Sequence, residues 1–96
     1  MDIIAERVFD FASNDGTTAA AIRVQMGRPE LEPDGKTWRA PYAIVGPGST
    51  DVWLKYTTGV DGLQALKLAL HVLPLDLMLY QQWGSVTWLG QSDLRL

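Results

Sequence analysis

The hydrophobic pattern of this chain changes its period once, between Gly59 and Gly62. Before that point, apolar side chains recur at every second residue in short segments separated by Gly, Pro and Asp clusters, which is typical of half-buried strands joined by turns. After it, they recur at three- and four-residue spacing, which is typical of an amphipathic helix. This order predicts an α+β domain in which a C-terminal helix covers one face of an antiparallel sheet.

Four segments carry the two-residue period. We expect strands at Ile3–Phe11, Thr18–Met26, Thr37–Val45 and Asp51–Thr57. The connections are short, which favours an antiparallel meander, except for the loop Gly27–Lys36 with its two prolines. Because Pro41 offers no N–H to a neighbouring strand, the third segment is expected at an edge of the sheet or with a bulge at Pro41.

The start of the helix carries the best local signal in the chain. Asp61 is placed to cap it, and Gln64 is placed to reach back as the second half of a capping box. The leucines that follow at helical spacing are expected to face the sheet, with a narrow polar stripe opposite. The leucines are Leu63, Leu66, Leu70 and Leu73, with Ala69 between them, and the stripe is Gln64, Lys67 and His71.

Pro74 interrupts this pattern. A proline there removes a helix hydrogen bond to Leu70 and disfavours helical geometry at Leu73, so the helix is expected to break or kink and to restart from Leu75 to Gln82. Beyond it, the segment Ser85–Leu89 favours a short fifth strand.

Length and composition point to one domain spanning residues 1–96, because two cores would each be too small. With 47% hydrophobic and 20% charged residues, the chain can build a core without a metal or a disulfide. The absence of cysteine removes thiol nucleophiles and thiolate metal sites. The net charge of -3 argues mildly against binding nucleic acid through its phosphates. We expect no cofactor and no metal.

The cellular location is expected to be the cytoplasm. Asp2 and Glu6 stand where a secretory signal would carry Lys or Arg. The longest apolar region, Leu63 to Tyr80, contains Lys67 and Asp76 and is interpreted as too polar to span a membrane.

No set of residues in the sequence suits catalysis, so we do not expect an enzyme. His71 is the single histidine, and its helical neighbours are Lys67 and Gln64, not a serine or an acid. The clustered acids Glu30, Glu32 and Asp34 lack the spacing of a calcium loop and are interpreted as solvated. No catalytic or metal-ligating residue is therefore assigned.

Several short motifs are shared with known proteins. They are Met26-Gly27-Arg28-Pro29, Trp38-Arg39-Ala40-Pro41-Tyr42, Gly59-Val60-Asp61 with Gln64-Ala65-Leu66, and Trp88-Leu89-Gly90. In these the chain resembles a family of small, functionally uncharacterised bacterial proteins of about this length. The resemblance implies a bacterial source and a shared fold, and it implies no activity. Pro74 departs from the family pattern.

Surplus apolar residues near the C-terminus suggest the leading hypothesis, a non-catalytic protein-interaction module. It would bind itself, as a homodimer, or another protein, through its sheet edge or its apolar C-terminal region. A kinked second helix that completes the core would explain the same residues equally well. The candidate contact residues are Arg28, Trp38, Tyr42, Trp53, Tyr80, Trp83 and Trp88.

Two alternatives remain open from the sequence. The first is weak binding of single-stranded nucleic acid, which requires Arg7, Arg23, Arg39 and Lys55 to share one exposed sheet face. The second is a small anionic ligand held by Arg28, which requires a pocket where Arg28 meets an acid such as Asp61 or Glu6.

Overall fold

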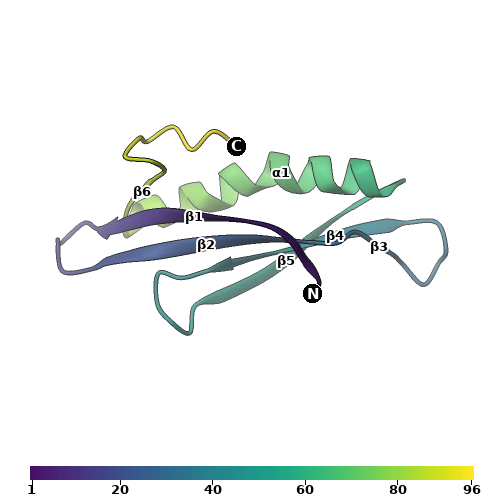
Figure 1. Ribbon diagram of the computed structural model, residues 1–96, viewed down its shortest axis with the longest axis horizontal. Helices are drawn as coiled ribbons and strands as arrows, with labels where there is room; N and C mark the ends of the chain where they lie inside the picture. The colour runs from purple at the N-terminus through teal and green to yellow at the C-terminus, as the bar shows by residue number, and fades with distance from the viewer.

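The computed structural model describes residues 1–96 as an open antiparallel sheet of six strands with one helix on one face (Figure 1). This confirms the α+β class, but the expected count of four strands with a fifth short one is too low. The elements are β1 (Ile3–Ser13), β2 (Ala19–Gly27), β3 (Glu30–Leu31), β4 (Trp38–Val45), β5 (Val52–Gly59), α1 (Gly62–Met78), the 3-10 helix η1 (Leu79–Gln82) and β6 (Gly84–Thr87).

The strands β1, β2, β4 and β5 follow one another across the sheet, and β6 pairs with the outer edge of β1. The extra strand β3 pairs with β4 and continues the line of β2, but its register is shifted by one residue. The interruption lies opposite Pro41, which has no N–H to donate. Of the two expectations for this strand, the structure therefore fits an irregularity at Pro41, since β4 is central and not an edge.

Gly27 ends β2 at this irregularity because the chain there leaves no room for a side chain. A Cβ at Gly27 would lie 2.8 Å from the Pro41 ring and closer still to Met1. The glycine thus allows the backbones of β2 and β4 to approach where their ladder is broken.

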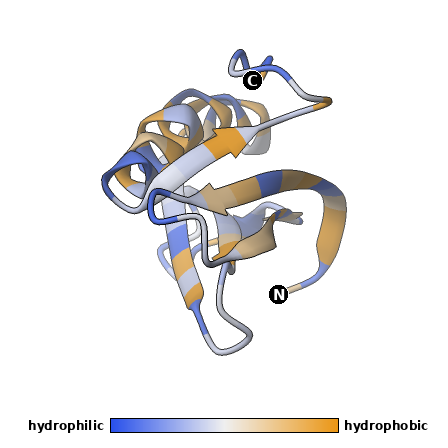
Figure 2. Cartoon of the chain, turned by 90° about the vertical axis from the view of Figure 1, so that its left-hand side faces the viewer, coloured by the Kyte–Doolittle hydropathy of each residue, from blue (hydrophilic) through white to orange (hydrophobic).

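The core lies between the sheet and α1. Hydrophobic and hydrophilic residues alternate along the strands, as Figure 2 shows, and the hydrophobic set of the inner strands faces the helix. The largest fully buried side chains are Tyr42, Phe9, Ile22, Ile44, Leu73 and Leu77.

The helix meets the sheet on a face that is rotated from the expected one, although Leu73 is buried and Leu66 packs against the core as expected. Its buried hydrophobic residues are Ala65, Ala69, Leu73 and Leu77, whereas Leu63 is 80% exposed and Leu70 is exposed as well. The reason is steric: two alanines let the helix axis come close to the sheet, and a Cβ at Gly59 would lie 2.6 Å from the Ala65 nitrogen. Because the helix lies close to the sheet, the small side chains of Ala65 and Ala69 fit between them where larger ones would not.

The capping box is confirmed. Asp61 Oδ1 accepts a hydrogen bond from the Gln64 N–H at 2.8 Å, and Gln64 Oε1 accepts one from the Val60 N–H at 2.7 Å. Of the two expectations for Pro74, the break is wrong, because α1 continues through it and ends at Met78, while the kink stays a prediction. Leu73 and Leu77 are both buried, so packing on both sides of the proline offsets the lost helix hydrogen bond.

By length and composition alone, Gly62–Gln82 is apolar enough to cross a membrane, so the expectation that this region is too polar for a span is not supported. Such a composition is also found in helices of soluble proteins. Here one side of the helix packs on the sheet, and much of its remaining apolar surface is exposed.

Candidate interaction surface

The strand β5 forms an edge of the sheet and pairs only with β4. In an antiparallel pair, successive residues of a strand point their N–H and C=O groups alternately towards and away from the neighbouring strand. The Gly46 N–H donates to the Asp51 carbonyl at 2.8 Å, which shows that the groups of Asp51 point towards β4. From this alternation, the peptide groups of Trp53, Lys55 and Thr57 point towards β4. Those of Val52, Leu54, Tyr56 and Thr58 point away from the sheet. The outward groups offer a second chain a complete set of donors and acceptors.

The side chains of β5 leave this edge unprotected. Val52, Leu54 and Tyr56 lie on the face opposite the helix, where Leu54 is 70% exposed. Edge strands are commonly protected by proline, bulges or outward charges. β5 has no proline, and its one charged residue, Lys55, turns under the helix.

A second apolar surface lies beside this edge on α1 and η1. We call it the leucine flank, and it consists of Leu68, Val72, Leu75 and Leu79. At 100° per residue these four positions fall within a narrow arc of the helix. The flank faces β5, because Asp76 next to it contacts Lys55, and Leu79 shares a cleft with Val52 and Trp53. Leu75 is 60% exposed.

The same cleft, with a volume of about 670 Å³, brings together three of the expected contact residues: Trp53, Tyr80 and Trp83. The rings of Tyr80 and Trp83 meet edge to face, with centroids 5.8 Å apart. The Tyr80 hydroxyl donates to the Gly46 carbonyl at 3.2 Å. Burial, followed by the charges of Asp51 and Asp76, raises the pKa of Tyr80, so this hydroxyl stays protonated as a donor.

Tyr42 is not a surface contact but part of a buried polar cluster. Its hydroxyl donates to Asp76 Oδ2 at 2.6 Å, and the Lys55 ammonium donates to Asp76 Oδ1 at 2.7 Å. Asp76 is only 5% exposed. Burial first, and then the hydrogen bond to Asp76, raise the pKa of Tyr42. The cluster joins α1 to β4 and β5, and Asp76 was not among the residues expected from the sequence.

The three remaining candidate residues do not form a site. Arg28 is 71% exposed at its side chain, with Asp2 as its ion-pair partner at 3.8 Å. Trp38 packs against the core, and Trp88 lies 3.9 Å from the Arg7 guanidinium, measured to the ring centroid. The anion-pocket alternative required a pocket in which Arg28 meets Asp61 or Glu6. The exposed side chain of Arg28 pairs with Asp2 instead, so this requirement is not met.

The four strand-borne cations do not share a face. Arg7 donates to the Leu94 carbonyl on the face of Phe9, and Lys55 binds Asp76 under the helix. Arg23 and Arg39 lie on the opposite face, paired with Glu6 and Glu30 respectively. The requirement of the nucleic-acid alternative is therefore not met.

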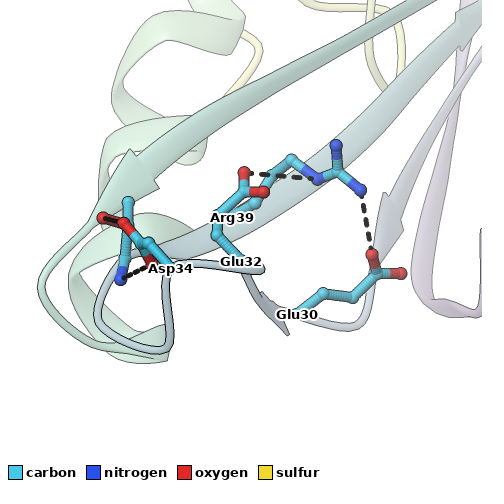
Figure 3. Close-up of polar contacts among 5 residues, drawn as sticks. Glu30, Glu32, Asp34 and Arg39 are labelled. Carbon is cyan, nitrogen blue, oxygen red and sulfur yellow. Dashed lines mark hydrogen bonds and ion pairs between the residues drawn. The ribbon is translucent and has the colours of Figure 1, made fainter.

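The acidic residues around β3 are engaged in local structure (Figure 3). Arg39 lies between Glu30, at 3.1 Å, and Glu32, at 3.8 Å. Asp34 accepts hydrogen bonds from the amides of Lys36 and Thr37, and the bond from Thr37 contributes most to lowering the pKa of this carboxyl. The interpretation of these acids as merely solvated is thus incomplete, because they hold the turn and brace Arg39.

Comparison with known proteins gives one match. No curated protein and no solved structure matches the chain. A family model described as a domain of unknown function matches residues 5–96. This agrees with the resemblance to uncharacterised proteins noted from the sequence motifs. Because the match spans almost the whole chain, the protein belongs to the family described as "Domain of unknown function (DUF6968)".

Proposed function

We propose that this domain is a non-catalytic protein-interaction module that pairs, through the free edge of β5, with an extended strand of another polypeptide chain. The observation that carries the proposal is the run of outward peptide groups on β5, flanked by exposed Val52, Leu54 and Tyr56. In strand addition of this kind, main-chain hydrogen bonds supply affinity and alternate side chains supply specificity.

The surroundings of the edge support this proposal. The leucine flank and the aromatic cleft lie next to β5, so an added strand would meet apolar surface as well as peptide groups. Leu, Trp and Tyr exposed in one region are typical of binding surfaces. Lys55, the one charged residue of β5, binds Asp76 and so has a structural role in holding the helix on the sheet.

The test is amide hydrogen exchange along β5, measured by NMR. Two samples are compared: concentrated protein, and dilute protein to which a peptide copying residues 51–59 is added. We expect the outward amides of Val52, Leu54 and Tyr56 to become protected in at least one of them, because pairing removes these N–H groups from water. The amides of Trp53, Lys55 and Thr57, already bonded to β4, serve as the internal reference.

A peptide methylated on the nitrogens of its Leu54 and Tyr56 positions is the matched control, since it has the same side chains and cannot complete the ladder. If the outward amides of β5 exchange as fast as those of an unfolded chain in both samples, the proposed function is wrong.

A further inference from the structure

We infer that the strand that pairs with β5 is the β5 of a second copy of this chain, and that the two leucine flanks pack together in the same dimer. This inference rests on the proposed function, because it uses the same edge and names the partner. A two-fold axis perpendicular to the sheet at Leu54 would extend the sheet across both copies and place both helices on the same face.

The cross-strand pairs produced by this axis are complementary. In an antiparallel pair centred on Leu54, each Leu54 faces the partner's Leu54, and Val52 faces the partner's Tyr56. On the helix side, Trp53 faces the partner's Lys55, and the same pairing of a tryptophan ring with an ammonium already exists within one copy at 4.7 Å. A register centred on Lys55 would instead oppose two like charges, which is unfavourable.

The helix position fits the same axis. α1 lies over β4 and β5, so its axis stands roughly one strand spacing, about 4.8 Å, from the midline of such a dimer. The two helices would then lie about 10 Å apart, within the usual distance for packed helices. The side chains that would fill this space are those of the leucine flank, because they face β5.

The spacing along the flank also agrees with the strand register. Thr57 contacts Ala65, and Leu79 lies in the cleft with Val52 and Trp53, so Leu54 is level with the middle of the flank. Antiparallel helices related by an axis at this level place Leu68 against the partner's Leu79 and Val72 against the partner's Leu75. The spacing of four, three and four residues along the flank is that of a coiled-coil seam.

A single copy exposes more surface than its size requires. Its accessible surface is 6106 Å² for a mass of 10.6 kDa, whereas a typical monomer of that mass exposes about 5,500 Å². The difference approaches the surface, about 800 Å² per partner, that a standard interface covers. The partner strand and the partner flank together offer a way to cover it.

The experiment is cysteine cross-linking, which the complete absence of native cysteine makes specific. In the Leu54→Cys variant, the two Cα atoms of the central pair would lie about 5.5 Å apart, which suits a disulfide. We expect mild oxidation to convert this variant to a covalent dimer. Val52→Cys is the matched control, since its two copies would lie four residues apart along the strands, about 13 Å. It should cross-link only when combined with Tyr56→Cys.

The role of the flank is tested by light scattering during size exclusion, at protein concentrations from about 50 to about 500 µM. Leu75→Glu changes the flank and leaves the strand β5 itself unaltered, and we expect it to raise the dimer dissociation constant at least tenfold. Leu63→Glu is the matched control: it changes another exposed leucine of the same helix, outside the flank, and should leave the dissociation constant unchanged.

The inference is overturned if the wild type stays monomeric at 500 µM, or if Val52→Cys alone cross-links as fast as Leu54→Cys. It is also overturned if Leu63→Glu dissociates the dimer as strongly as Leu75→Glu. These results would not by themselves overturn the proposed function, which fails only when the outward β5 amides stay unprotected both in the concentrated protein and with the copied peptide. Loss of that protection together with a surviving dimer would overturn both, because the dimer would then use another surface.

Discussion

Asp76 is the one charged residue among the buried residues of the domain, and two neighbours satisfy both of its oxygens. A carboxylate buried in this way requires its donors, because removal from water is costly without them. It stands between Leu75 and Leu77, and the sequence offered a signal for it: Asp76 follows the buried Ala69 by seven residues and Leu73 by three. The signal was missed because the expected break at Pro74 left the helix register undefined.

Replacing Asp76 with leucine should destabilise the domain by about 2–4 kcal/mol, because the Tyr42 hydroxyl and the Lys55 ammonium lose their acceptor. The free energy of unfolding from urea titration measures this effect. Adding Lys55→Met to Asp76→Leu should recover part of the loss, since the uncompensated charge is then removed. An Asp76→Leu variant as stable as the wild type would contradict a structural role for the cluster.

At the scale of the element, some features of α1 are determined by local sequence and others by packing against the sheet. Its start was predicted correctly because the capping box of Asp61 and Gln64 involves only residues within one turn. Its buried face was predicted only in part: Ala69 and Leu73 are buried as expected, whereas Leu63 and Leu70 are exposed and the sheet instead buries Ala65 and Leu77. Neither the close approach at Gly59 nor the burial on both sides of Pro74 can be deduced from the helix sequence alone.

Replacing Pro74 with alanine should therefore stabilise the domain by about 1–3 kcal/mol, because the helix already continues there and alanine supplies an N–H that can donate to the Leu70 carbonyl. Thermal unfolding followed by circular dichroism measures the change. Asp61→Ala, which removes the cap of the same helix, should act in the opposite direction by about 1 kcal/mol. A lower melting temperature for Pro74→Ala would show that the proline ring contributes more through packing than it costs the helix.

At the scale of the whole molecule, the meander of β1, β2, β4 and β5 was predicted from the alternating pattern, while the closure of the fold was not. The contact of β6 with β1 joins residues far apart in sequence, such as Thr87 and Asp10, and no local pattern encodes that pairing. The same holds for Arg7, which donates to the carbonyls of Leu94 and Arg95 and stacks on Trp88. The free edge of β5 follows from the same topology, so the candidate surface was only partly visible in its aromatic residues.

Replacing Arg7 with alanine should release the segment from Trp88 to Arg95 and cost about 1–2 kcal/mol, because two hydrogen bonds and a cation–π contact are lost. Hydrogen exchange of the amides in this segment should accelerate, while the amides of β2 and β4 should remain the more slowly exchanging ones. Arg7→Lys should restore only part of the loss, because an ammonium can donate to a carbonyl but lacks the planar guanidinium that stacks on Trp88. Unchanged exchange in the alanine variant would show that the segment is held by Leu94 packing instead.

The antiparallel pairing of β1 with β6 also determines how the domain responds to tension. Asp10 pairs with Thr87 and Ser13 with Gly84, so the chain leading into β1 and the chain leaving β6 depart from the same end of the pair. A force applied through those two segments peels the strands apart one bond at a time, beginning at Thr87, instead of shearing the whole ladder at once. The Arg7 contacts with Leu94 and Arg95 lie ahead of that opening and would break first, so a domain pulled in this way yields at low force and in steps.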